Sequence, residues 1–174
     1  MDVNPLRKLL QEARREADFE LLLFGWNGTD RKTLRNCLQG IPHTHIPSVP
    51  VMDYFKKMHS LQADFAIMPL RDNSYNRAKS HHKLLQYAML GIPAIVADVP
   101  TYTDFIKDQP EGDDFGIVQA RVAKSNREWI DHIIYMCTWA RSEQLAEINA
   151  TNAKLIQKNG LLNTQIYRWC ECFC

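Results

Sequence analysis

Short apolar runs alternate with amphipathic stretches along most of the chain. Four such runs extend from Phe19 to Phe24, Phe65 to Met68, Ala94 to Ala97 and Phe115 to Val118. Runs of this length are typical of strands that are buried on both faces of a parallel sheet. A weaker, edge-like strand is expected from Ile41 to Val49. Five strands that alternate with helices predict an α/β, Rossmann-like parallel sheet with helices on both faces.

Helix starts are indicated by capping residues that precede apolar positions at helical spacing. Thr101 with Asp104 and Ser125 with Glu128 have the spacing of capping boxes, and Gly91 is expected to end a helix that Ser80 begins. The expected helices begin at Asn4, Asp30, Pro50, Ser80, Thr101, Ser125 and Ser142. We expect one domain over residues 1–160, followed by a C-terminal tail over residues 161–174.

Charge and length limit the classes of function. The 174 residues carry 21 basic and 20 acidic side chains, a net charge of +1. This balance provides no broad positive field for nucleic acid or an anionic membrane, so any anion site must be local. No apolar run approaches the roughly 18 residues of a membrane span. Five cysteines and no signal-peptide profile favour a cytoplasmic protein with reduced thiols.

The metal-ligating residue types form no convincing site. His43 and His45 alternate on one face of the expected edge strand, where an exposed strand face explains them better than a metal site. Cys170, Cys172 and Cys174 alternate at the end of the chain, and they lack a fourth ligand for a zinc tetrahedron. We therefore expect no metal and no cofactor.

The helix expected after Ser80 carries the most informative polar pattern. Lys79, Lys83 and Gln86 are spaced at i, i+4 and i+7, which predicts one polar stripe. Lysines at a helix N-terminus that follows a strand favour an anion site, because free amide groups and the helix dipole add to their charge. The alternative is a solvated lysine face on a crossover helix. The connection from Pro69 to Ser80 is long for this class of fold, which favours a functional loop.

The segment from Phe65 to Pro100 also resembles a known family. It is similar to the donor-site segment of GT-B-fold glycosyltransferases of the family 4 (group 1) type, especially the members that build bacterial surface polysaccharides. Two positions depart from the pattern, since Ala78 and Gln86 stand where many members carry glutamates. The matching residues are Pro69-Leu70, Asn76, Ala78-Lys79-Ser80, Lys83, Tyr87-Ala88, Gly91 and Pro93.

The resemblance implies a fold, a reaction and residue roles. The chain would correspond to the C-terminal, donor-binding half of a GT-B hexosyltransferase, which transfers a sugar from a nucleoside-diphosphate sugar to a glycan or other acceptor without a metal. Lys79 and Ser80 would face the diphosphate, Lys83 would add positive charge, and Gln86 would face the ribose hydroxyls.

The loop after the Phe65 strand holds further polar candidates. They would either contact the sugar or only shape the loop, and they are Arg71, Asp72, Asn73, Asn76 and Arg77.

The same resemblance leaves open whether the chain works alone. In the family a first strand and its glycine-rich loop precede the helix that begins here at Asn4, and the acceptor binds to an N-terminal domain. We therefore expect a fragment or a shortened relative, completed by that domain or by a partner chain, and inactive by itself. The alternatives are a non-catalytic GT-B-like module that binds a nucleotide or a protein and, less favoured, a sugar-nucleotide epimerase of GT-B fold.

Overall fold

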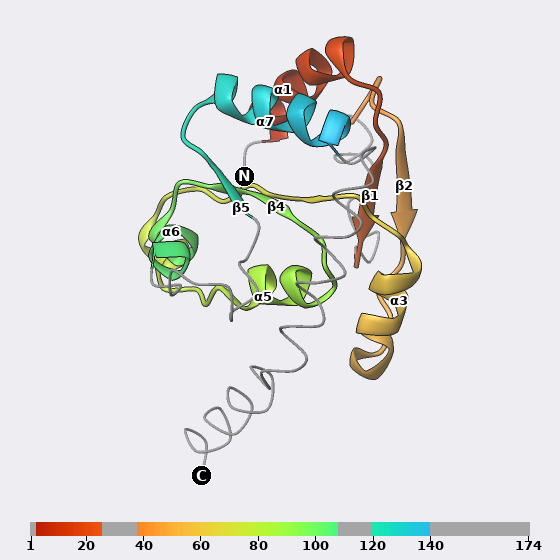
Figure 1. The fold of residues 1–174 in the computed structure, drawn as a ribbon, viewed down its shortest axis with the longest axis vertical. Coiled ribbons are helices and arrows are strands. Elements are labelled where there is room, and N and C mark those ends of the chain that lie inside the picture. The colour runs from red at the N-terminus through yellow and green to blue at the C-terminus, as the bar shows by residue number, and fades with distance from the viewer. Residues whose placement is uncertain (1–2, 26–37, 108–119, 140–174) are drawn as a thin grey trace.

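The chain forms an α/β fold with parallel strands (Figure 1). The structure is a computed structural model that describes residues 3–25, 38–107 and 120–139. In chain order the described elements are α1 (Val3–Glu16), β1 (Leu21–Phe24), β2 (His43–Ile46), the 3-10 turn η1 (Val51–Asp53), α3 (Tyr54–Ser60), β3 (Ala66–Met68), α4 (Ser74–Arg77), α5 (His82–Met89), β4 (Ala94–Ala97), α6 (Pro100–Lys107), β5 (Ala120–Ala123) and α7 (Asn126–Trp139).

The described strands form two parallel sheets. β1 pairs with β2, and β4 lies between β3 and β5 in a second sheet. The register places Ile95 of β4 beside Ile67 of β3 and Arg121 of β5. Parallel strands need crossover connections, and α5 and α6 lie in those connections. The parallel α/β architecture is therefore confirmed, whereas the expected single sheet of about five strands is not what the described residues show.

The apolar core lies on both faces of the three-stranded sheet. In Figure 1 α1 and α7 lie together on one side of it and α5 on the other. Successive residues of β4 point to opposite faces, so Ile95 joins the α1–α7 cluster while Val96 joins the cluster under α5 and α6. All four residues of β4 are buried, as the apolar run predicts for a central strand.

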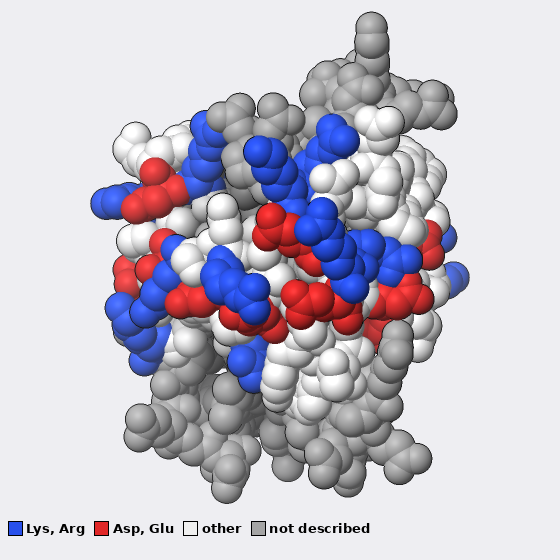
Figure 2. All heavy atoms as spheres, turned by 90° about the horizontal axis from the view of Figure 1, so that it is seen from above, with Lys and Arg blue, Asp and Glu red and all other residues white. Residues whose placement is uncertain are grey.

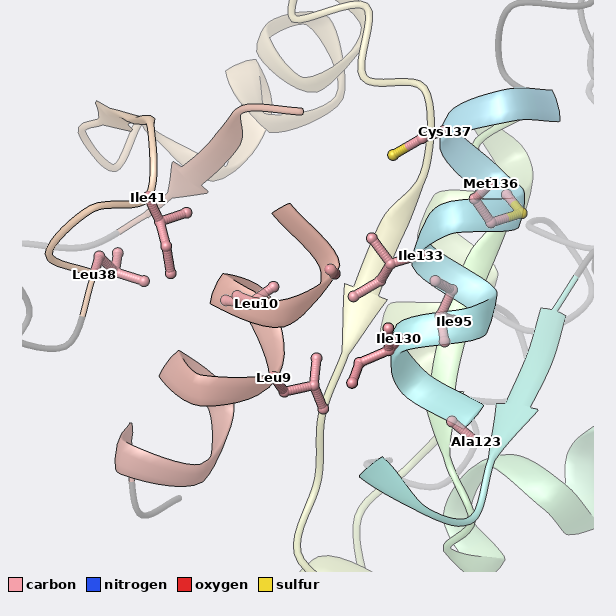
Figure 3. Packing of buried hydrophobic residues seen from close by; sticks show 11 residues of the cluster. Leu9, Leu10, Leu38, Ile41, Ile95, Ala123, Ile130, Ile133, Met136 and Cys137 are labelled. Atoms are coloured by element: carbon pink, nitrogen blue, oxygen red, sulfur yellow. The ribbon is translucent and has the colours of Figure 1, made fainter. Parts of the chain in front are cut away.

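Helix α1 completes the α1–α7 cluster by packing on α7. Leu9 and Leu10 of α1 lie beside Ile130 and Ile133 of α7 (Figure 3). Each such side chain contributes roughly 1.5–3 kcal/mol when it is fully buried, and Leu10 is only 1% exposed. α1 begins at Val3, so the expected cap Asn4 lies within the helix.

Two predicted helix ends are confirmed. Gly91 follows α5 with φ of 69°, and the amides of Gly91 and Ile92 donate to the carbonyls of Ala88 and Tyr87. This is the Schellman arrangement, which glycine permits because it has no Cβ. At the start of α7 the Glu128 amide donates to the Ser125 hydroxyl at 3.2 Å, as expected of a capping box.

The capping box predicted for α6 is wrong. The amides of Tyr102 and Thr103 donate to the Val99 carbonyl, so the helix begins before Thr101. The Thr101 hydroxyl instead donates to the Asn76 carbonyl at 2.6 Å. The Thr101 side chain, which the local pattern assigns to the helix cap, therefore bonds to a carbonyl of the α4 segment instead.

Some of the described strands differ from the prediction in length, and one differs in position. β2 covers only His43–Ile46 of the expected run, and β5 was not predicted at all. The expected strand from Phe115 to Val118 lies outside the described residues, as do the helices expected at Asp30 and Ser142 and the tail 161–174.

The surface that bears α1 and α7 has no patch made of charges of one sign only. Figure 2 shows basic and acidic side chains mixed over this face, in keeping with a net charge of +1. Among the described helices none has the length and apolar content needed to cross a bilayer.

Candidate functional site

The carboxyl ends of both sheets meet at one contact between two helices. α3 leads into β3 and α5 leads into β4, so each helix ends near the amino end of a strand and begins toward the carboxyl edge. The Lys83 ammonium of α5 donates to the Tyr54 hydroxyl of α3 at 2.7 Å. Ligands of parallel α/β proteins bind outside the carboxyl ends of the strands, so this contact marks the candidate site.

Aromatic rings surround the Lys83 ammonium. Its Nζ lies 4.7 Å from the ring centroid of Tyr54 and 5.8 Å from that of Tyr87. The Tyr54 ring meets Phe24, the last residue of β1, edge to face at 5.4 Å. These contacts hold the cation at a fixed place while its side chain stays exposed.

Both tyrosine hydroxyls keep their protons at neutral pH. Burial raises the pKa of Tyr54 above its ordinary value of 10.0. Burial also raises the pKa of Tyr87, against the opposing effect of the Lys83 charge. A neutral tyrosine donates as well as accepts hydrogen bonds, so the site combines one cation with two hydroxyl groups.

The start of α5 differs from the prediction that Ser80 caps it. α5 begins at His82 after His81, and no side chain caps its first turn. The Ser80 hydroxyl instead lies 2.9 Å from Nδ1 of His82, so it does not reach the helix amides. The predicted cap is wrong, and the first-turn amides of α5 have no side-chain acceptor.

The predicted polar stripe is also broken. Lys79 lies between α4 and α5 rather than on the helix, and its ammonium lies 4.7 Å from the ring centroid of Tyr75. Lys83 and Gln86 do lie on α5. The structure therefore keeps two of the three stripe residues on one helix and places Lys79 on the loop before it.

The loop after β3 is held by its own polar side chains. Asn73 caps the single turn α4 by accepting the Asn76 amide at 2.8 Å. Asn76 is buried, and its side-chain amide donates to the Arg71 carbonyl at 2.8 Å. Asn73 and Asn76 therefore shape the loop, which agrees with one of the two roles that the sequence left open.

Asp72 and Arg77 form a bidentate ion pair within the same loop. The Arg77 guanidinium donates to the two Asp72 oxygens at 2.5 and 2.6 Å. Its hydrogen bond, followed by its charge, holds the pKa of Asp72 below the ordinary value of 3.8. Both side chains are exposed, so the pair adds little stability and mainly fixes the loop's outer surface.

The histidines expected to hold no metal lie on the surface. His43 and His45 are both exposed on β2, and Nδ1 of His43 lies 2.8 Å from the Ile41 carbonyl. Within the described part of the chain, no three His, Cys, Asp or Glu side chains are grouped to hold a metal ion. Cys170, Cys172 and Cys174 lie outside that part.

Sequence reasoning missed the aromatic part of the site. The sequence pattern gives Tyr54 no role at the site, and it gives Tyr87 only a place in the family motif. Lys83 and Tyr54 are 29 residues apart, and no local periodicity links residues across two helices. The one available signal was the pair of helices that each follow an expected parallel strand.

Comparison with models of known families, with curated proteins and with solved structures finds no match. The assignment of a function therefore rests on the local geometry and on the resemblance carried by residues Phe65 to Pro100.

Proposed function

We propose that the chain is a nucleotide-sugar-binding domain that corresponds to the donor-binding half of a GT-B glycosyltransferase. The observation that carries the proposal is the placement of Lys83. This cation lies in the first turn of a helix whose N-terminus has no side-chain cap, at the carboxyl edge of parallel strands. Such a helix start attracts a phosphate through the helix dipole and the added charge.

The proposed chemistry is stabilisation of a leaving diphosphate. As the glycosidic bond breaks, negative charge develops on the diphosphate, and fixed positive groups lower the energy of that state. Lys83 and the dipole of α5 supply this charge, and Lys79 and Ser80 on the preceding loop approach from the side. Gln86, one turn further along α5, faces the ribose hydroxyls.

The finer fold belongs to the same proposal. We take β1 to β5 as parts of one Rossmann-like domain, since the bond between Lys83 and Tyr54 brings the carboxyl edges of both sheets together. The transfer uses no metal, the acceptor is a glycan or related molecule, and the location is the cytoplasm, as the sequence predicts.

Titration with UDP, GDP and ADP, followed by amide chemical shifts and by calorimetry, tests the proposal. We expect shifts at the start of α5. Lys83→Ala should weaken nucleotide binding by roughly 5- to 30-fold, or about 1–2 kcal/mol, the worth of one charge-assisted contact.

Two variants separate the charge from its surroundings. Tyr54→Phe keeps the Lys83 cation and removes only its hydroxyl partner, so we expect a smaller loss of affinity. Lys107→Ala removes an exposed lysine from the last turn of α6 and should leave the affinity unchanged. Equal losses from Lys83→Ala and Lys107→Ala, or shifts confined to β2, would contradict the proposal.

A further inference from the structure

An apolar cleft separates the two sheets. Its volume is about 780 Å³, and it lies between β1 and the segment Phe65–Ile67 that contains β3. Leu10 of α1 and Ile133 of α7 line one side, and Met58 of α3 and Tyr87 of α5 line the other. The cleft therefore extends through the layer that the strands occupy, between the two layers of helices.

Both strands that flank the cleft direct backbone groups into it. In β1 the amides of Leu21 and Gly25 donate toward β2, and amides along a parallel strand alternate in direction. The amides of Leu22 and Phe24 therefore point to the cleft. In β3 the Ala66 amide donates toward β4, so the Ile67 amide points to the cleft as well.

No strand pairs with these two edges in the part of the chain that the structure describes. Backbone groups in apolar surroundings need partners, and an open strand edge is a template for another strand. β1 reads Leu-Leu-Leu-Phe, which is typical of a strand with neighbours on both edges and helices on both faces. Leu21, Leu23 and Ile67 are nevertheless only partly buried.

The two ends of the cleft differ in charge. Asp18 and Glu20 precede β1, Asp64 precedes β3, and all three line the cleft. Asp18 is already paired with Arg14, so Glu20 and Asp64 carry the negative charge of this end. Lys83, at the carboxyl edge, lines it as well. An occupant with a basic amino end and an uncharged or acidic carboxyl end would complement this distribution.

We propose that the cleft binds one extended apolar strand of another polypeptide, inserted parallel to β1 and β3 with basic residues at its amino end. The inserted backbone pairs with the open edges of β1 and β3 and so joins the two sheets. This is strand addition, in which a peptide extends a sheet, but at two edges at once. Its side chains alternate between the α1–α7 layer and the α3–α5 layer. A compact apolar ligand would fill the space and leave both rows of backbone groups without partners. This inference does not rest on nucleotide binding.

Residue-resolved amide exchange of the full chain, with and without a probe peptide, tests the inference. The probe is acetyl-Lys-Lys-Val-Ile-Val-Val-Ser amide, and the control is the same peptide in reversed order. We expect the probe to slow exchange of the Leu22, Phe24 and Ile67 amides by about tenfold or more at saturation. The amides of Leu21 and Ala66 already donate within the sheets and should change much less.

A charge reversal at the acidic end tests the orientation. Asp64 is exposed, so Asp64→Lys should leave the fold intact while it weakens probe binding by roughly 3- to 10-fold at low salt. Asp104→Lys, at an exposed position on α6, is the matched control and should have no effect.

Each other outcome overturns the inference. Equal binding of the reversed peptide contradicts the parallel orientation, and binding without amide protection indicates an apolar ligand cleft. Protection that depends on protein concentration alone indicates self-association of this chain, and no binding of the probe excludes strand insertion. Nucleotide affinity measured in the same samples reports separately on the proposed function.

Discussion

Gln86 is the residue at which the chain departs from the family pattern on the helix of the candidate site. A glutamate there would accept hydrogen bonds from both ribose hydroxyls, whereas glutamine offers one acceptor oxygen and one amide donor. We expect Gln86→Glu to tighten ribonucleotide binding by roughly 1–2 kcal/mol. Calorimetric titration of a ribonucleotide and of its 2′,3′-dideoxy analogue measures the effect.

The dideoxy analogue is the control for charge. A new carboxylate near the diphosphate repels both ligands equally, so the difference between their affinities reports on the hydroxyl groups alone. Unchanged affinities for both ligands would place Gln86 away from the ribose and would favour the non-catalytic interpretation.

His81 makes the stability of the fold depend on pH. Its ring stacks on Phe105 with centroids 3.9 Å apart. Burial, and to a smaller extent the charge of His82, lowers the pKa of His81 below its ordinary value of 6.5. As the pH falls through 6.5, the unfolded chain binds a proton that the folded chain does not, so this residue's contribution to stability is present above 6.5 and is lost below it.

His81→Phe keeps the stacking on Phe105 and removes the titration. Urea unfolding at pH 7.5 and pH 5 should therefore show a smaller loss of stability in the variant than in the unsubstituted chain. Other titrating groups act equally in both proteins, so an identical loss would show that His81 does not contribute.

Individual site residues were predictable only as far as local periodicity reaches. Helical spacing after a strand placed Lys83 and Gln86 on one helix, as observed. The same spacing failed for Lys79 and Ser80, because the turn α4 and the contact of Ser80 with His82 delay the start of α5. Tyr54 reaches the site through tertiary packing, which no sequence window contains.

At the scale of elements, one hydroxyl joins α4 to α6. Thr101 is buried, and its hydroxyl donates to the Asn76 carbonyl. Thr101→Val keeps the shape and removes this donor, while the Lys79 amide still donates to the same carbonyl at 3.2 Å, so we expect a loss of about 0.5–1.5 kcal/mol in the free energy of unfolding. Urea denaturation measures the loss.

Thr101→Ser retains the hydroxyl and serves as the control for the lost bond. It should cost less than Thr101→Val, and amide exchange in the loop of residues 71–80 should rise only in the valine variant. A valine variant as stable as the serine variant would show that the Thr101 hydrogen bond contributes nothing to the free energy of unfolding.

The elements that the sequence predicts well are those whose signals are local. The continuous apolar run predicts β4, all of whose residues are buried, and Gly91 predicts the end of α5. β5 contains Arg121, which interrupts an apolar pattern, and the guanidinium lies 3.7 Å from the ring centroid of Tyr135 on α7. The contact with Tyr135, which lies on a later helix, therefore stabilises Arg121 within β5. The sequence around β5 does not contain this contact, so its pattern does not predict the strand.

At the scale of the molecule, the number of sheets was not predictable. Each strand's pattern reports its own burial and says nothing of whether the next strand lies directly beside it. β1 and β3 both read as interior strands, and the cleft lies between them.

Donor binding alone does not produce transfer. Catalysis requires donor and acceptor in near-attack geometry, and the proposed donor contacts all come from α5 and the loop before it. We expect the purified 174-residue chain to release or transfer no sugar at an ordinary enzymatic rate. A radiolabelled-donor assay measures this, and appreciable turnover would contradict it.

The packing of α1 on α7 has a consequence for the protein's synthesis. Leu9 and Leu10 are made before their partners Ile130 and Ile133, which follow about 120 residues later. At about 5–20 residues per second the apolar stripe of α1 waits about 6–25 seconds for its partner. During those seconds the ribosome-bound chain presents that stripe to chaperones and to neighbouring nascent chains, and only the arrival of α7 withdraws it.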